Sequence, residues 1–295
     1  MAHQRLGQTT EAADSLDRAE RTMRQDNQLS GNEELSLLHT EARSVVRPSA
    51  TGGAPTPSTN GAVAPTLQQR RNLALWLRAD EGVAVDSADR VRSWIDQSGD
   101  GHHASQTTSI TQPLLVRNVL NGRPVIRFDG NDSLNLSGQV LTSARFSIFA
   151  LVSDRASDES YRVIFSNWRG NPNSVFISTL RQNPRRARFT DDLGGYTHNS
   201  NFGVGAITTP GSHFILTGIS STNNALIYQN ETLIAQRGSR LSPRNLLPPY
   251  VIGTQGTGGE FWFGDLAELL VYNAELSVAE RQGVWAYFNE KYLSR

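Results

Sequence analysis

The stretch that decides the fold is residues 260–292, EFWFGDLAELLVYNAELSVAERQGVWAYFNEKY. Its first part runs apolar from Leu266 to Tyr272, which is typical of a central β-strand covered on both faces. Ser277 and Glu280 then have the spacing of a capping box, which predicts the start of a helix. The apolar side chains that would share one side of this helix are Val278, Val284, Trp285, Phe288 and Tyr292. We therefore expect the closing strand and sealing helix of a β-sandwich.

Short apolar runs separated by Gly, Asn, Asp and Pro clusters fill the chain upstream, from about residue 72. They lie at residues 73–80, 91–94, 124–128, 133–136, 146–152, 162–167, 174–180, 187–190, 213–220, 225–229, 232–236 and 250–253. An α/β fold would need helices between such strands, and from residue 72 onward the sequence offers a strong helical pattern only at its end. The sequence therefore predicts a mainly β fold, a two-sheet antiparallel jelly-roll sandwich with a C-terminal helix.

Composition divides the chain into three predicted parts. Residues 1–47 form a short α-helical segment, with one helix capped by Thr10 and running to about Asp26 and a second from about Glu33 to Val46. Residues 48–71 are rich in Pro, Gly, Ser and Thr, which predicts a disordered linker. Residues 72–295 form the β-sandwich.

The small and apolar residues of the first helix have a repeat-like spacing. Leu6-Gly7, Ala12, Leu16 and Ala19 resemble the second half of a tetratricopeptide repeat. A lone repeat cannot bury its apolar stripe, because solenoid repeats are stabilised by their neighbours. Two alternatives follow: the helices pack on each other as a hairpin, or the reading frame is the tail of a longer repeat protein with a helical-repeat partner.

Charge and composition exclude several classes of function. The 295 residues carry 28 basic and 28 acidic side chains, so no global field attracts nucleic acid or an anionic membrane. The absence of cysteine excludes disulfides, thiolate metal sites and cysteine nucleophiles. The polar N-terminus lacks the apolar core of a signal peptide, and the apolar runs are too short to span a bilayer. We expect neither a nucleic-acid partner nor membrane insertion.

An ordered set of motifs runs through the β region. In chain order they are Trp76, Trp94-Ile95-Asp96-Gln97-Ser98-Gly99, His102-His103-Ala104, Asn121-Gly122-Arg123-Pro124, Phe128-Asp129-Gly130, Phe263-Gly264-Asp265-Leu266-Ala267-Glu268, Leu276-Ser277 and Glu280-Arg281. Together they resemble a concanavalin A-like lectin/glucanase domain of the laminin-G-like jelly-roll kind, over residues 72–295. The resemblance implies a lectin-like module of the kind found in large bacterial surface and signalling proteins.

One departure from this resemblance lies at a hairpin. Such domains often turn with Asn-Gly, whereas this chain has Asn230-Glu231. A glutamate held at positive φ would cost about 1 kcal/mol, so we expect a longer turn or another turn type.

The resemblance includes glucanases, which use carboxylates paired across one glycosidic bond. The nearest set here is Glu260, Asp265 and Glu268. In a regular strand Glu260 and Asp265 face opposite sides, and Glu260 and Glu268 lie roughly 27 Å apart. The sequence also lacks a nucleophile elbow, a phosphate-binding loop and a His-Glu-x-x-His motif. We therefore expect no enzyme activity, and a glycan hydrolase is the least favoured hypothesis.

Two acidic loops raise the question of calcium. Asp96 and Asp100 begin a run that starts like a calcium loop, but its twelfth position is Thr107 where a glutamate is expected. Asp129 and Asp132 flank a similar turn. Both loops are typical of Asx turns, while a rim site for calcium stays open as the alternative. No other cofactor is expected.

Polar loops with an aromatic residue are candidates for sugar binding, because a pyranose offers apolar C–H faces beside its hydroxyls. The first such loop contains Trp168, Arg169 and Asn171, and the second contains Tyr196, His198 and Asn199. Four arginines gather nearby, at positions 181, 185, 186 and 188. A solvated hairpin turn is the first interpretation of these arginines, and contact with an acidic glycan or phosphate is the alternative.

We expect a non-catalytic recognition module that binds carbohydrate through its loops. The alternative is a protein-interaction or scaffold domain, so the expected partner is a glycan or a protein surface. Without a signal peptide in the chain as given, a cytoplasmic location is the default, although modules of the resembled family are often exported.

Overall fold

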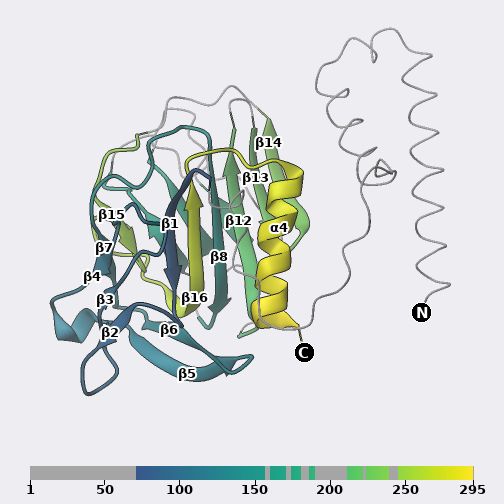
Figure 1. Cartoon of the computed structure of the whole chain (residues 1–295). Helices are drawn as coiled ribbons and strands as arrows, with labels where there is room; N and C mark the ends of the chain where they lie inside the picture. Colours follow the sequence, from purple (N-terminus) through teal and green to yellow (C-terminus); the bar gives the residue numbers. More distant parts are fainter. Residues whose placement is uncertain are drawn as a thin grey trace, which may run out of the picture. The chain divides into compact units, whose positions relative to one another are not determined.

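The computed structural model describes residues 71–156, 160–170, 174–180, 186–189, 211–221, 224–238 and 245–294. Over these residues the chain forms two antiparallel β-sheets and a C-terminal helix, which confirms the predicted fold class (Figure 1). The helical segment, the tetratricopeptide-like spacing and nearly all of the predicted linker lie outside the described residues.

The first sheet has the strand order β14-β13-β12-β8-β16-β6-β5, and β1 also pairs with β16. Its strands are β1 (Leu73–Arg78), β5 (Leu114–Leu120), β6 (Arg123–Asp129), β8 (Phe146–Asp154), β12 (Phe214–Ser220), β13 (Asn224–Gln229), β14 (Thr232–Gly238) and β16 (Phe263–Tyr272). The predicted closing strand thus lies in the interior of the sheet, between β8 and β6.

The second sheet has the strand order β11-β10-β9-β15-β7-β4-β3-β2. Its strands are β2 (Val83–Val85), β3 (Val91–Trp94), β4 (Ala104–Ser105), β7 (Leu134–Leu136), β9 (Tyr161–Ser166), β10 (Phe176–Leu180), β11 (Arg186–Phe189) and β15 (Tyr250–Ile252). A 3-10 helix, η1 (Ser109–Thr111), follows β4.

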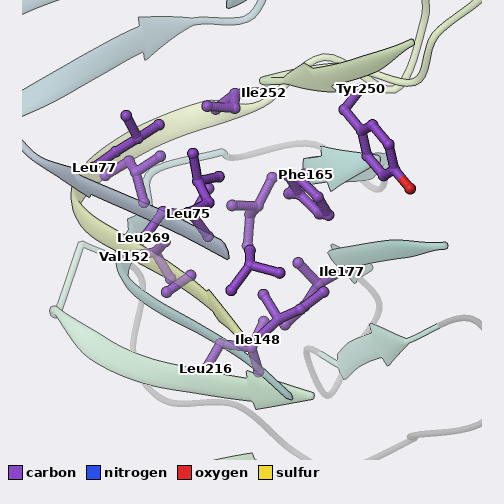
Figure 2. Packing of buried hydrophobic residues seen from close by; sticks show 14 of the residues in the cluster. Leu75, Leu77, Ile148, Val152, Phe165, Ile177, Leu216, Tyr250, Ile252 and Leu269 are labelled. Carbon is purple, nitrogen blue, oxygen red and sulfur yellow. The ribbon is translucent and has the colours of Figure 1, made fainter. Parts of the chain in front are cut away.

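The main core lies between the two sheets. Figure 2 shows side chains from β1, β8, β12 and β16 facing side chains from β9, β10 and β15. Leu269 and Ile148 from the first sheet and Phe165 and Ile252 from the second are all fully buried. Trp262, just before β16, is also buried in this core, whereas Phe261 and Phe263 on either side of it are half-buried. This alternation is the one expected of a strand whose successive side chains point to opposite faces.

The helix α4 (Val278–Phe288) lies against the first sheet (Figure 1). A second apolar cluster lies between this helix and the outer face of the sheet. Ser277 and Glu280 form the predicted capping box, and a short π-helix, η3 (Asn289–Leu293), continues the helix. Trp285 packs edge-on against Phe149 of β8. No helix among the described residues is long and apolar enough to cross a membrane.

A buried ionic cluster joins this helical end to the sheet. The Glu268 carboxylate accepts hydrogen bonds from Trp76 Nε1 (2.5 Å), Tyr287 Oη (2.8 Å), Tyr292 Oη (2.6 Å) and Lys291 Nζ (2.9 Å). Lys291 Nζ also donates to Asp80 at 3.1 Å. Both Glu268 and Lys291 are almost fully buried. The hydrogen bonds of the cluster therefore compensate these two charges for the water that they lose on burial.

The hairpin between β13 and β14 is a two-residue turn, because Gln229 pairs with Thr232. The residue at positive φ is Asn230 (+54°) rather than Glu231. Asparagine tolerates this conformation, and Asn230 Oδ1 accepts a hydrogen bond from the Ile215 N–H at 3.0 Å. Of the two expected alternatives, the longer turn is wrong and the other turn type is found, because only the asparagine has a positive φ.

Candidate functional site

The outer face of the second sheet carries polar and aromatic side chains at the β9–β10–β11 edge. Ile177 and Phe189 point into the core, so Phe176, Ser178 and Arg188 point outward by strand alternation. A bulge in β9 shifts the pairing by one residue there, so that Ser178 lies opposite Val163. The local sequence thus places an aromatic ring, a hydroxyl and an arginine on one outward face.

The Arg188 guanidinium is stacked against two aromatic rings. Its Cζ lies 3.9 Å from the ring centre of Tyr161 and 4.9 Å from that of Phe176. Nε donates to Ser178 Oγ at 2.8 Å, and Nη2 donates to Glu260 Oε2 at 2.5 Å. We name Tyr161, Phe176, Ser178, Arg188 and Glu260 the aromatic–arginine cluster. Its rings are half-buried, so each presents part of its surface to solvent.

Arg188 is only 5% exposed. Burial lowers the pKa of its guanidinium below the usual value, and the Glu260 carboxylate acts in the opposite direction. A buried arginine needs such a partner, because an unpaired charge away from water is strongly disfavoured. The Glu260 carboxylate therefore compensates the charge of Arg188 in this cluster.

Glu260 reaches this position from a strained turn. Its φ is +48°, a left-handed conformation that costs a non-glycine residue about 1 kcal/mol. Gly258 and Gly259 before it also have positive φ. The Glu260 carbonyl accepts a hydrogen bond from the Val163 N–H at 2.8 Å, which fixes the turn beside β9. Its side chain remains 25% exposed.

Trp168 and Arg169, both predicted for ligand binding, lie in the loop that follows β9. Ser166 pairs with Phe176, and the Trp168 N–H donates to Ser166 Oγ at 2.8 Å. Trp168 thus lies two residues beyond the Ser166–Phe176 pair, outside the strand. Trp168 is half-buried and Arg169 is exposed. The structure therefore places Trp168 in the loop that continues from the Ser166–Phe176 pair.

The turn after β15 packs closely on this loop. The Gly256 N–H donates to the Trp168 carbonyl at 2.8 Å. A Cβ at Gly256 would lie 2.8 Å from both this carbonyl oxygen and Arg169 Cγ, so a larger residue would push the loops apart. Residues 254–260 thus support Trp168 at one end and the Glu260 carboxylate at the other.

The remaining predicted ligand residues, Asn171, Tyr196, His198 and Asn199, lie outside the described residues. Of the four clustered arginines, Arg188 is not in a solvated turn, so that first interpretation was wrong for this residue. It lies in β11, where strand pairing with β10 carries its side chain over Ser178 and the two rings.

The calcium candidates are used as turn residues. Asp96 accepts hydrogen bonds from the N–H groups of Trp76, Ser98 and His102 and from Ser98 Oγ. Asp129 Oδ1 accepts from the Asn131 N–H, and Asp132 Oδ2 accepts from the Asp129 N–H. Asp100 is exposed. Across the described ranges, no group of three or more His, Cys, Asp or Glu side chains is arranged to hold a metal ion.

The three carboxylates considered for hydrolysis have separate partners. A bulge in β16 places Asp265 opposite Ser153 and Glu268 opposite Leu151, so these two share the outer face of the first sheet, which regular alternation does not predict. Asp265 is held by two hydrogen bonds from Arg127, at 2.7 and 2.9 Å. Burial acts to raise the pKa of Asp265, but Arg127 and His213 together outweigh it and the pKa lies below its usual value. The carboxylates of Asp265 and Glu268 are both buried and bonded to cations. Glu260 belongs to the aromatic–arginine cluster on the second sheet.

A separate groove of about 350 Å³ lies between the turn after β1 and the β5–β6 hairpin. Asp80, Arg117 and Asn118 are among its lining residues. Burial would raise the pKa of Asp80, but Lys291 and Arg78 outweigh this effect and lower it. The Asp80 carboxylate in this groove is thus a neutralised part of the ionic cluster under the helix.

Sequence reasoning missed Tyr161 and Phe176 and gave Glu260 a different role. Each of these residues begins or precedes a strand and has no motif of its own. A usable signal existed in the alternation of β10 and β11, which places Phe176, Ser178 and Arg188 outward once these strands are paired.

Comparison with protein families gives one match. A family model described as "Concanavalin A-like lectin/glucanases superfamily" matches residues 128–280, just over half of the chain. No curated protein matches the sequence.

Solved structures share the fold at low sequence identity. The binding domain of Paraclostridial Mosquitocidal Protein 1 is 17% identical, with a TM-score of 0.53 over 75% of this chain and 54% of that one. Domain 4 of AbnA, a GH43 extracellular arabinanase from Geobacillus stearothermophilus, in complex with arabinotriose, is 12% identical, with a TM-score of 0.51 over 71% of this chain and 96% of that one. A structure titled for botulinum neurotoxin type C and its interaction with two ganglioside molecules is 12% identical, with a TM-score of 0.53 over 74% and 52%. This chain thus spans about half of the first and third structures.

Proposed function

This chain belongs to the concanavalin A-like lectin/glucanases superfamily, and on that premise we propose that it is a non-catalytic carbohydrate-binding module. The proposed site is the aromatic–arginine cluster together with the Trp168 loop. The observation that carries the proposal is the pair of partly exposed rings, Tyr161 and Phe176, beside the partly exposed Glu260 carboxylate. Half-buried Trp168 lies in the loop that follows β9.

This arrangement suits a sugar for physical reasons. Ligand sites combine apolar and aromatic surface with a few fixed polar groups that set orientation. The C–H face of a pyranose can pack on the rings, while its hydroxyls bond to carboxylate and backbone oxygens. The rings are anchored on strands and on a glycine-supported loop, so little ordering entropy is lost on binding.

Similar structures support a binding role over a catalytic one. One neighbour, domain 4 of the arabinanase, is described in complex with arabinotriose, and another title names ganglioside interaction. Glycoside hydrolysis needs two free carboxyl groups roughly 5 to 10 Å apart across the substrate. Asp265 and Glu268 are buried, and each is bonded to a cation.

Titration of the full chain with a panel of neutral and acidic oligosaccharides, followed by calorimetry, tests the proposal. We expect Trp168→Ala and Phe176→Ala each to weaken binding by roughly tenfold, because each removes a stacking surface worth about 1.4 kcal/mol. Ile110→Ala is the matched control, since it shortens a side chain that is 73% exposed and lies outside the cluster.

Absence of binding across the panel by a folded chain would overturn the proposal and favour a protein surface as the partner. Equal affinity in the two ring variants and the control would place the sugar site elsewhere.

A further inference from the structure

We propose that the aromatic–arginine cluster selects a carboxylated sugar, such as a uronic acid residue, whose carboxylate takes the place of Glu260 on Arg188. This inference rests on the proposed carbohydrate-binding function and narrows it to a ligand class. It follows from how Arg188 is held, from how Glu260 reaches it, and from what the surrounding rings offer.

Arg188 is fixed before any ligand arrives. Contacts with Tyr161 (3.9 Å) and Phe176 (4.9 Å) set the plane of the guanidinium, and the 2.8 Å bond to Ser178 sets its rotation. A fixed guanidinium presents its donors as a planar fork that matches a carboxylate. Because the fork is already ordered, binding loses little side-chain entropy.

Glu260 marks the position that an external carboxylate would take. Its Oε2 accepts the Nη2 hydrogen bond at 2.5 Å, and a quarter of its side chain remains exposed to solvent. The residue is held at φ +48° behind two glycines at positive φ. Strain of this kind is found at sites where a group must be held ready or released. Glu260 is therefore an internal competitor that a ligand carboxylate can displace from the solvent side.

The rings explain why the acid should belong to a sugar. Tyr161 and Phe176 are half-buried beside the guanidinium, so each presents part of its surface to solvent. A carboxylate on Arg188 thus has apolar ring surface next to it. A small free anion would leave this surface unused, whereas the C–H face of an adjoining sugar ring can cover it.

The test compares the full chain with two matched ligand pairs. The first pair is oligogalacturonate and the same preparation after chemical reduction of its carboxyl groups, and the second is sialyllactose and lactose. We expect the acidic member of at least one pair to bind about tenfold or more tightly, because a hydrogen bond to a charged group contributes roughly 1.5–3 kcal/mol. This preference should shrink as salt is added.

Glu260→Gln probes the displacement step directly. Removing the competing charge increases the fraction of molecules with Arg188 free, so binding of the acidic sugar should tighten several-fold while the neutral one changes little. Arg188→Lys keeps the charge but loses the fork, and should abolish the preference. Glu290→Gln is the control, since it makes the same charge change at an exposed residue of η3.

The outcomes separate this inference from the function on which it rests. Equal binding of acidic and neutral members would overturn the inference and leave carbohydrate binding standing. Absence of binding to both ligand pairs and to the neutral panel would overturn this inference and the proposed carbohydrate-binding function. Acid preference that persists unchanged in Glu260→Gln and Arg188→Lys would place the recognition elsewhere and also overturn the inference. If Arg188→Lys fails to fold, the wild-type ratio and Glu260→Gln still decide.

Discussion

Individual charged residues in this sandwich differ mainly in how their charge is solvated. Glu268 is fully buried and accepts from four donors, and Lys291, the single lysine of the chain, is bonded to both Glu268 and Asp80. Such clusters contribute modestly when complete, but breaking them leaves a buried charge without its partner. The ionic cluster therefore attaches the C-terminal helical end to the first sheet, and substitution of its charged residues should be poorly tolerated.

Lys291→Met should destabilise the fold by about 3 kcal/mol, because it removes the cation that pairs with Glu268 and Asp80. Urea unfolding checks this value. Arg117→Met is the matched control: Arg117 is 56% exposed and pairs with Asp89, so its loss should cost less than about 1 kcal/mol. Equal stability of the two variants would contradict the buried-pair argument.

The Asp132 carboxyl should make the free energy of unfolding fall as the pH rises from its pKa in the unfolded chain to its pKa in the folded chain. Burial, together with the neighbouring Asp129 carboxylate, raises the pKa of Asp132 from 3.8 to about 6. Between these values the folded chain keeps a proton that the unfolded chain has lost, so raising the pH favours unfolding. Asp132→Asn removes this titration while retaining an acceptor for the Asp129 N–H.

The variant should therefore gain stability relative to the wild type between about pH 4 and pH 6, by up to about 2 kcal/mol. Urea unfolding at several pH values measures the difference. Asp100→Asn, at an exposed residue, should show no such trend. A stability difference for Asp132→Asn that is constant with pH would refute the assignment.

At the scale of elements, irregular strands decide what each sheet face presents. The bulge in β16 turns Asp265 and Glu268 to the same side, and the bulge in β9 turns Tyr161 and Val163 outward. The helix, in contrast, begins at its predicted capping box and buries Val284, Trp285 and Phe288 as predicted, because caps and 3.6-residue spacing are local. Of the other predicted positions, Val278 is only half-buried. Strand β5 was not predicted: Asn118 at φ +56° interrupts its pattern, and most of its residues are exposed or half-buried.

For the whole molecule, the ionic cluster links segments from both ends of the predicted sandwich domain, with Trp76 and Asp80 at one end and Lys291 and Tyr292 at the other. The proposed sugar site lies on the second sheet, whereas the helix covers the first. The helix that closes the fold and the proposed sugar site thus lie on different sheets.

A chain of residues 71–295 should unfold at the same temperature as the full chain, because the two sheets and the helix are all drawn from this range. A chain that stops at Phe288 lacks Lys291 and Tyr292 and should unfold at a clearly lower temperature. Thermal unfolding followed by circular dichroism compares the three. A large loss of stability on removal of residues 1–70 would show that the domain boundary proposed near residue 72 is wrong.

Short-range patterns were sufficient for much of the architecture. Alternation and turn residues predicted most strands, the capping box predicted the helix start, and the ordered motifs indicated the lectin-like family, which the family match confirms. Among the predicted ligand residues, Trp168 and Arg169 lie in the loop that the proposed site includes. These features depend on neighbours in the chain, so they can be predicted without knowing which strands pair.

The partners of Arg188 were decided by the tertiary structure alone. Tyr161, Phe176, Arg188 and Glu260 come from four segments spread over about a hundred residues, and strand pairing with a bulge brings their side chains together. The sequence determined the sandwich and its sealing helix because burial of apolar faces depends on a repeated local pattern. It did not determine the site, because contact between distant residues depends on strand order, register and bulges, which no local pattern encodes.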